Sequence, residues 1–499
     1  MITINTTNAE NPTNTIYIEN QTNNQIQEII NNAPDGSTII FQENQYNNLN
    51  LIINHSINLK NNQSTIQSNT QQPIFTITNT NNITIQNFNL ISTSDAILAE
   101  NTRNLNITNN KITTNSTGIN LNKIMNANII NNILTQNNNS AITITQSNNI
   151  QITNNTITNT TKDGIILKGT LNNINITNNQ LIQNGIPLSY AINLKSTNKN
   201  DKQNNIYIYN NNLTNNGNGI NIDVATNNLN ITENAIIRGA KGINIDQGYI
   251  NTNTSLYIDY NAFVQGTDLC IDARESIYEQ VGGIVVGSNW FNRNSNNGFI
   301  CPKVKAGILQ SNIKQIGDNT YQVYFTENGA EINTLANFNL RVKINGQITY
   351  TNIANGQGTF TVPGNIGTTA KVTVGDNDAL TVTIQEYKPI NPQPNKNNTP
   401  TENSQNTSGS NSGSDSGGDV NPSNTNNQNP QSNNPSSASV STSSSTSSQE
   451  ATQSEITKTL TLDEDSFRVI GIPGLLILII LAILIYYNED IRKAIKKQQ

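Results

Sequence analysis

Charged and aromatic residues are scarce in this chain of 499 residues. Asp, Glu, Lys and Arg together make up 12% of the sequence and aromatic residues 5%, and the formal net charge is −6. A surface that follows nucleic-acid phosphates needs clustered Lys and Arg, so we expect no nucleic-acid partner. The hydrophobic fraction of 34% is small for a globular core, but a fold one coil wide needs few inward side chains in each turn.

Cysteine and histidine are nearly absent. The chain has two cysteines, Cys270 and Cys301, and one histidine, His55. Two cysteines exclude a disulfide-dense scaffold and a four-cysteine metal site. In an exported protein Cys270 and Cys301 could join in a disulfide, closing a loop of about 30 residues and contributing about 3 kcal/mol. The alternative is two unpaired thiols in a reduced compartment.

What the chain has instead is repetition. The phrase apolar-x-apolar-x-Asn-Asn-x-apolar stands at 105–112, 150–157 and 174–181. A second phrase, a small residue followed by alternating apolar positions, separates the copies. Its first apolar residue recurs at 97, 119, 142 and 165, in steps of 22, 23 and 23 residues. Internal periods of this size indicate a stacked solenoid. The second phrase begins at Ala96, Gly118, Ala141, Gly164, Ala191, Gly219 and Gly242.

The short apolar runs alternate with period two and are rich in Ile, which favours strands over helices. Two or three such strands per turn, each stacked on its equivalent in the next turn, make an all-β parallel β-helix. We expect Ile columns inside, outward Asn and Thr in ladders, and the Asn-Asn pairs at corners, because Asn tolerates the left-handed backbone region.

The pattern changes along the chain. Residues 25–32 have apolar positions at helical spacing, so a short amphipathic helix should cover the open end of the first coil. The only tryptophan, Trp290, is expected in a closing plug at the other end of the stack. Short alternating runs between 303 and 387 predict an immunoglobulin-like β-sandwich. The predicted segments are 1–72 (first strands, capping helix and first coils), 73–302 (β-helix with plug), 303–387 (sandwich), 388–458 (disordered Ser/Asn/Pro-rich linker), 469–487 (transmembrane helix) and 488–499 (basic cytoplasmic tail).

The segment 469–487 has no charged residue and is long enough to cross a bilayer. Basic residues follow it, so the positive-inside rule predicts a single-pass membrane protein with an extracellular N-terminal region and a cytoplasmic C-terminus. Residues 1–14 lack the basic and apolar segments of a secretory signal. Export would therefore need a start upstream of Met1, a longer parent chain or a non-standard path.

Several motifs carry a family resemblance. The stretch 25–40 is similar to the start of the NosD-like and pectate-lyase-like right-handed β-helix superfamily, and Ser288-Asn289-Trp290-Phe291 resembles the Asn-Trp-Trp-Gly motif that closes such helices. With its sandwich, polar stalk and anchor, the chain looks like the Asn/Thr-rich adhesin-like surface proteins of methanogenic archaea. The resemblance implies surface display and adhesion to a glycan or protein on a host or microbial cell.

One outward column could hold a cation. The fourth residue after each small residue gives Glu100, Asn122, Thr145, Lys168, Lys195, Asp223, Asp246 and Asp272. Stacked carboxylates repel one another by up to about 1 kcal/mol per pair in water unless a cation answers them. Lys195 could balance the charge of Asp223, and Ca²⁺ bound by Asp223, Asp246 and Asp272 could balance the remaining carboxylate charge. The alternative is a solvated charge column. No other cofactor is expected.

We expect no catalytic residues, and adhesion is the predicted function. The competing hypothesis is a polysaccharide lyase or hydrolase, because β-helix enzymes use carboxylates and a basic residue on an outer face, and Arg238, Lys241 and Arg274 lie near the acidic column. The chain lacks the Gly-His-Gly and Asn-Thr-Asp motifs of polygalacturonases. A third hypothesis is a structural envelope component that binds nothing.

Overall fold

The computed structural model describes residues 14–62, 64–246, 255–273, 284–295 and 306–389. Cys301, the predicted linker from residue 390 onward and the predicted transmembrane helix 469–487 lie outside these residues, so the expected disulfide and anchor stay predictions. No helix within the described ranges combines the length and apolar character that a bilayer span requires.

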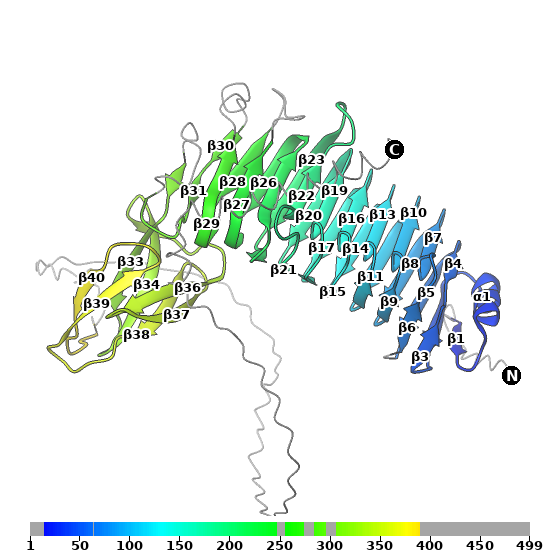
Figure 1. Ribbon diagram of the computed structural model, residues 1–499, viewed down its shortest axis with the longest axis horizontal. Coiled ribbons are helices and arrows are strands. Elements are labelled where there is room, and N and C mark those ends of the chain that lie inside the picture. Colours follow the sequence, from blue (N-terminus) through cyan, green and yellow to red (C-terminus); the bar gives the residue numbers. More distant parts are fainter. Residues whose placement is uncertain (1–13, 63, 247–254, 274–283, 296–305, 390–499) are drawn as a thin grey trace, which may run out of the picture. The chain divides into compact units, whose positions relative to one another are not determined.

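The regular coils each contribute one strand to a 12-stranded sheet and two to an 18-stranded sheet, counted over the described residues (Figure 1). Every strand pair in both sheets is parallel, for example β11 with β14 and β13 with β16. The first sheet contains β1 (Thr15–Ile18), β2 (Ser37–Phe41), β5 (Ile57–Asn61), β8 (Asn81–Gln86), β11 (Arg103–Thr108), β14 (Met125–Ile130), β17 (Asn148–Thr153), β20 (Leu171–Thr177), β23 (Lys202–Tyr209), β26 (Ala225–Thr232), β28 (Leu256–Asp259) and β30 (Ile284–Val286). The second contains β3 (Gln45–Asn47), β4 (Leu51–Ile53), β6 (Thr65–Ser68), β7 (Phe75–Thr78), β9 (Asn89–Ser92), β10 (Ile97–Glu100), β12 (Lys111–Thr114), β13 (Ile119–Asn122), β15 (Ile133–Thr135), β16 (Ile142–Thr145), β18 (Thr156–Thr158), β19 (Ile165–Lys168), β21 (Gln180–Ile182), β22 (Tyr190–Lys195), β24 (Asn212–Thr214), β25 (Asn218–Asp223), β27 (Ala235–Ile245) and β29 (Ala262–Ala273).

Isoleucine columns fill the interior of this stack. Ile107, Ile129, Ile152 and Ile176 follow one another in register along β11, β14, β17 and β20, and each is fully buried. Branched side chains suit this position because they pack well on the pleated surface of a strand. The all-β solenoid expected from the period is confirmed.

The two residues of each Asn-Asn corner have different structural roles. The first Asn of each pair takes positive φ, as at Asn131 and Asn154, in agreement with the prediction. The second Asn points inward and is buried, as at Asn132 and Asn155. The expectation that the amide ladders are outward is therefore incomplete. An exposed ladder exists, but the more extensively bonded ladder lies inside, because the buried polar groups of each corner need partners.

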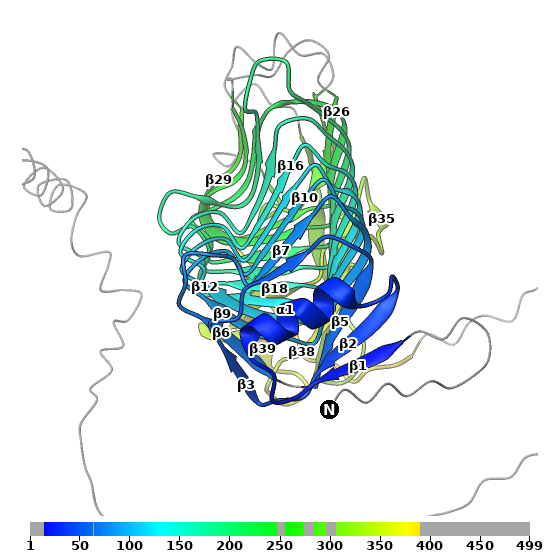
Figure 2. The same ribbon diagram turned by 90° about the vertical axis from the view of Figure 1, so that its right-hand side faces the viewer.

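The helix α1 (Asn23–Asn32) occupies the segment expected to be helical and lies across the first coil (Figure 2). Thr22 and Gln25 form a capping box at its start. Ile26 and Ile30 are fully buried, and the Gln27 side chain exchanges hydrogen bonds of 2.9 Å with the backbone N–H and carbonyl of Ile52 on β4. The helix thus covers both the apolar columns and the open strand edge.

Phe291, rather than Trp290, closes the apolar interior at the far end. The Phe291 ring stacks on Phe263 at 5.4 Å and belongs to the β-helix core. Trp290 is fully buried in a second core, where it makes a T-shaped contact with Phe325 at 5.1 Å between ring centroids. The expected plug role of Trp290 is wrong in this respect, because adjacent residues of an extended segment point to opposite sides.

Residues 310–383 form short antiparallel strands in two four-stranded sheets around that second core. A two-sheet antiparallel arrangement agrees with the rhythm of the sequence, and the immunoglobulin-like assignment stays a prediction. The strands are β31 (Ser288–Asn289) paired with β32 (Gly307–Ile308), then β33 (Gln310–Gln315), β34 (Thr320–Glu327), β35 (Ala330–Glu331) and β38 (Gln357–Thr361) in one sheet, and β36 (Phe338–Ile344), β37 (Gln347–Ile353), β39 (Thr369–Val374) and β40 (Leu380–Thr383) in the other.

Candidate functional site

A row of polar side chains crosses the outer face of β22, β25, β27 and β29. We call it the polar row; it consists of Asn193, Asn221, Asn244 and Asp272, which follow one another in register. Each lies between inward apolar residues, so its side chain points away from the core. The three asparagines are nevertheless only 5–9% exposed. The outer face is therefore enclosed here, and its polar groups are largely shielded from water.

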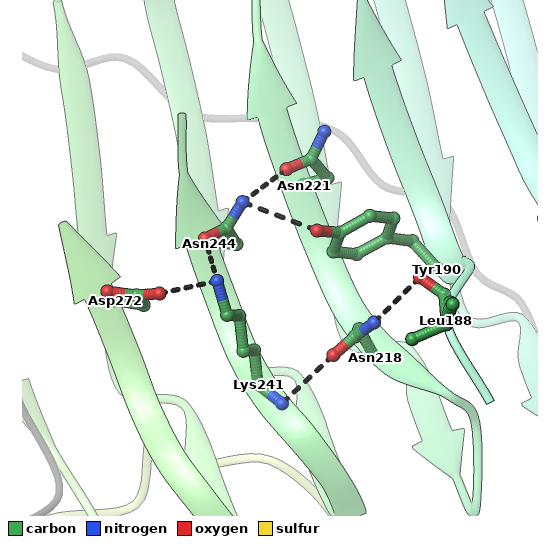
Figure 3. A network of polar contacts seen from close by, with 7 residues as sticks. All are labelled: Leu188, Tyr190, Asn218, Asn221, Lys241, Asn244 and Asp272. Carbon is green, nitrogen blue, oxygen red and sulfur yellow. Dashed lines mark hydrogen bonds and ion pairs between the residues drawn. The ribbon is translucent and has the colours of Figure 1, made fainter. Parts of the chain in front are cut away.

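Hydrogen bonds link the row in one direction, and Figure 3 shows the bond between Asn244 and Asn221. The amide nitrogen of Asn244 donates to Asn221 Oδ1 at 2.7 Å, and that of Asn221 donates to Asn193 Oδ1 at 3.0 Å. Asn193 Nδ2 in turn donates to Asp163 Oδ2 at 3.0 Å. An ionised carboxylate only accepts hydrogen bonds, so Asp163 orients every amide in the row with its nitrogen toward the earlier coil.

A lysine closes the other end of the row. Lys241 Nζ lies 2.6 Å from Asp272 Oδ2 and donates to Asn244 Oδ1 at 3.0 Å (Figure 3). An ammonium group only donates, so it complements the amide direction that Asp163 sets. The Lys241 and Asp272 side chains are 39% and 24% exposed. This charged pair is thus the part of the network that solvent or a ligand can reach.

Tyr190 stands among these groups on β22. Its hydroxyl lies 3.4 Å from Asn244 Nδ2, and its backbone N–H donates to Asp163 Oδ1 at 2.7 Å. Burial raises the pKa of the Tyr190 hydroxyl, and the surrounding carboxylates of Asp246, Asp163, Asp272 and Asp223 raise it further. Tyr190 therefore stays a neutral phenol, able to donate and accept hydrogen bonds.

Two residues before Tyr190, the backbone of Leu188 is tied to the next coil. Asn218 Nδ2 donates to the carbonyl of Leu188 at 3.0 Å, and Asn218 Oδ1 accepts from the backbone N–H of Lys241 at 3.2 Å (Figure 3). Side chain and backbone of three successive coils are thereby locked together. The network is thus hydrogen-bonded within the chain itself.

The predicted acidic column is correct for its first members only. Lys195 on β22 lies opposite Asp223 on β25, as expected. On β27 and β29, however, the residue opposite Asp272 is Asn244, which is two residues before Asp246. Asp272 therefore belongs to the polar row, and the expectation that it shares a column with Asp223 and Asp246 is wrong. Cys270, rather than Asp268, occupies the position of the small residue, and the one-residue register shift between Ile237 and Gly239 accounts for one of the two residues of this displacement.

Of the three carboxylates expected to hold Ca²⁺, Asp272 forms an ion pair within the chain. Lys241 pairs with Asp272, which supplies the positive charge that the cation was expected to supply. Burial and Asp246 raise the pKa of Asp223, while Lys195 opposes the shift. In the described ranges, no three His, Cys, Asp or Glu side chains cluster closely enough to hold a metal ion. Burial also raises the pKa of the Cys270 thiol, so this cysteine is a poor nucleophile and a poor ligand.

Sequence reasoning missed the central residues of the site. Leu188 lies in one of the longer connections between strands, where the repeat is interrupted, and Tyr190 is the first residue of β22 after that connection. The Asn residues of the row were visible as the third position of Ala-Ile-Asn-Leu and Gly-Ile-Asn-Ile, but the repeat alone does not show which outward residues are enclosed. The arrangement offers fixed amide, phenol, ammonium and carboxylate groups, which suits recognition of a ligand rich in hydroxyl or amide groups.

Comparisons with known proteins concern the fold of the chain. No curated protein sequence matches it. Among solved structures, it is similar to the A-module of a mannuronan C-5 epimerase from Azotobacter vinelandii (14% identity, 50% of this chain and 92% of that chain, TM-score 0.35). It is also similar to a polygalacturonase from Erwinia carotovora ssp. carotovora (14%, 58% and 87%, 0.34) and to PfbA, a surface adhesin of Streptococcus pneumoniae (14%, 63% and 96%, 0.33). Residues 73–236 match the family model described as "Right handed beta helix region", so this part of the chain is a right-handed β-helix.

Proposed function

We propose that this chain is a cell-surface adhesin-like protein whose β-helix binds carbohydrate or protein on a host or neighbouring cell. The observation that carries the proposal is the polar row: outward asparagines that are 5–9% exposed and oriented by Asp163 at one end and Lys241 at the other. A rigid, partly dehydrated polar surface loses little conformational entropy and little hydration when a polar ligand binds it. Membrane anchoring through 469–487 and outward display belong to the same proposal.

Carbohydrate is the ligand class that the chemistry favours. Sugar hydroxyls both donate and accept hydrogen bonds, and the accessible groups here are a donor, Lys241, an acceptor, Asp272, and Tyr190, which does both. Neighbouring coils repeat about every 4.8 Å along the stack. A linear glycan lying along the stack could therefore meet equivalent groups in succession.

The test is a glycan array with the full chain and three variants, one of which is a control. Tyr190→Phe keeps the ring and removes one hydroxyl, so it should weaken binding to the best glycan about fivefold, which corresponds to about 1 kcal/mol. Lys241→Gln, which removes the ammonium group, should weaken it more. Asn128→Ala, an exposed change on the 12-stranded sheet, is the control and should leave binding unchanged. Equal binding by all four proteins contradicts the assignment of this surface.

An enzyme on the same scaffold is the second candidate. The observation that favours it is Asp223, whose pKa is raised by burial and by Asp246, a condition typical of a general acid. Release of reducing or unsaturated ends from polyuronate, abolished in Asp223→Asn or Asp246→Asn, would establish this alternative and exclude pure binding. Binding without turnover supports adhesion. The absence of both binding and turnover supports a structural component.

A further inference from the structure

We propose a second binding site, separate from the polar row, that takes a glycan bearing carboxylate or sulfate groups. The site is a groove of about 520 Å³ at the corner between the two sheets, where β10, β13, β16 and β19 turn into β11, β14, β17 and β20. We call it the corner groove. The lining residues on which the inference depends are Asn101, Arg103, Lys123, Met125, Asn148 and Asn172.

The corner groove runs along the stack. Arg103, Met125, Asn148 and Asn172 occupy equivalent positions on four successive strands of the 12-stranded sheet. Three coil steps of about 4.8 Å give a length of roughly 14 Å, which suits a few units of an extended chain. The backbone on both sides is already paired within the parallel sheets, so a peptide cannot bind there by adding a strand.

The groove carries positive charge that is not balanced by an ion pair, in a protein of net charge −6. Arg103 and Lys123 line it from successive coils, and no acidic residue lines it. In the part of the chain that the structure describes, neither cationic side chain makes an ion pair or a hydrogen bond. The nearest carboxylate in sequence, Glu100, is engaged by Asn122 Nδ2 at 3.5 Å. An anionic ligand would therefore find two donors that are not committed elsewhere.

Lys123 adopts a left-handed backbone conformation that is unfavourable for lysine. Its φ is +55°, the left-handed region, where the two preceding coils place Asn79 and Asn101 at φ of 51° and 50°. Asn adopts this conformation more readily than Lys, so a lysine here sacrifices stability. Gln146 takes the same conformation in the next coil, with φ of 48°, so two of the residues that line the groove carry a backbone conformation of the kind that clusters at binding sites.

The remaining groups favour a sugar over a nucleic acid or a simple anion. The Oδ1 atom of Asn148 is buried and has no hydrogen-bond partner, and a ligand hydroxyl could supply the missing donor after a small rotation of the amide. Met125, 39% exposed, offers an apolar surface for the C–H face of a sugar ring. No aromatic residue lines the groove, so it lacks the stacking surface that single-stranded nucleic acids use.

The test measures calorimetric binding of the full chain to four probes of similar length: an oligogalacturonate, a sulfated oligosaccharide, a neutral oligosaccharide and an acidic peptide. At least one anionic oligosaccharide should bind, with an affinity that falls as salt is added. Arg103→Gln and Lys123→Asn should each weaken this binding about tenfold. Lys111→Gln, which removes an exposed cation outside the groove, is the matched control and should bind as the unmodified chain does.

Lys123→Asn also separates a binding role from a structural one. Because Asn suits the left-handed backbone, this variant should be at least as heat-stable as the unmodified chain while it loses affinity. Equal binding of the neutral probe, tighter binding of the acidic peptide, unchanged affinity in both groove variants or equal loss in Lys111→Gln would each overturn the inference. Lys241→Gln should retain this binding, so failure of the polar row as a site leaves the corner groove standing.

Discussion

Removing one amide from the buried ladder should destabilise the β-helix far more than removing one from its surface. Asn155 is 1% exposed, and its side chain makes five hydrogen bonds. Its oxygen accepts from the backbone N–H of Asn132 at 2.9 Å and from Asn132 Nδ2 at 3.0 Å. Its nitrogen donates to the carbonyls of Ile129 and Thr153 and to Asn179 Oδ1, at 2.8–3.1 Å.

The magnitude follows from what Asn155→Ala leaves behind. Each bond contributes about 1 kcal/mol net, and the buried N–H of Asn132 loses its partner at a cost of about 1–3 kcal/mol. Other carbonyl partners keep part of their bonding, so we expect a loss of about 3–5 kcal/mol in the free energy of unfolding. That is a large part of the 5–15 kcal/mol typical of a folded domain.

Asn128→Ala is the matched control for this measurement. Its amide makes one exposed bond of 2.8 Å to Asn106 Oδ1, so its removal should cost less than about 1 kcal/mol. Urea denaturation followed by far-ultraviolet circular dichroism gives both values. If Asn155→Ala costs no more than Asn128→Ala, the buried ladder does not stabilise the fold more than the exposed one.

Three further changes test other parts of the structure. Burial and Asp246 raise the pKa of Asp223, so the folded state binds more protons than the unfolded state and stability falls as pH rises through that pKa; Asp223→Asn should raise the melting temperature at pH 7, with the gain vanishing in acid. Phe291→Ala should cost about 3–5 kcal/mol in urea denaturation, since the ring closes the core. Gly242→Ala brings a methyl group within 2.4 Å of the Cys270 carbonyl oxygen, so it should lower stability by about 1–3 kcal/mol in the same assay.

The sequence was sufficient for the architecture because each coil repeats the same local instructions. Alternating Ile residues specify which face is inside, and the Asn-Asn pairs specify the corners. The second Asn of each pair was misjudged because an amide is ordinarily a surface group. Only stacking shows that a buried Asn132 can be satisfied by the coils before and after it.

The end of the stack was harder to predict because the repeat loosens there. The longer connections and the register shift near Gly239 break the count of residues on which the acidic column depended. A one-step or two-step change in register moves a residue to another column, so Asp272 lies in line with Asn244 instead of Asp246. Enclosure was equally invisible, since the distinction between a solvated Asn and one that is 5% exposed arises from neighbouring coils and loops.

The polar row and the corner groove differ in how their charges are balanced, although both lie on the same β-helix. In the polar row each charge is balanced inside the chain, Asp272 by Lys241, so recognition there depends on hydrogen-bond geometry and should depend weakly on salt. In the corner groove Arg103 and Lys123 are left unbalanced, so recognition should depend on the ligand's charge and strongly on salt. A stack of near-identical coils permits this because one outward residue can change without altering the inward column beside it. The salt dependence of binding in Lys241→Gln and Arg103→Gln is therefore the measurement that separates the two sites.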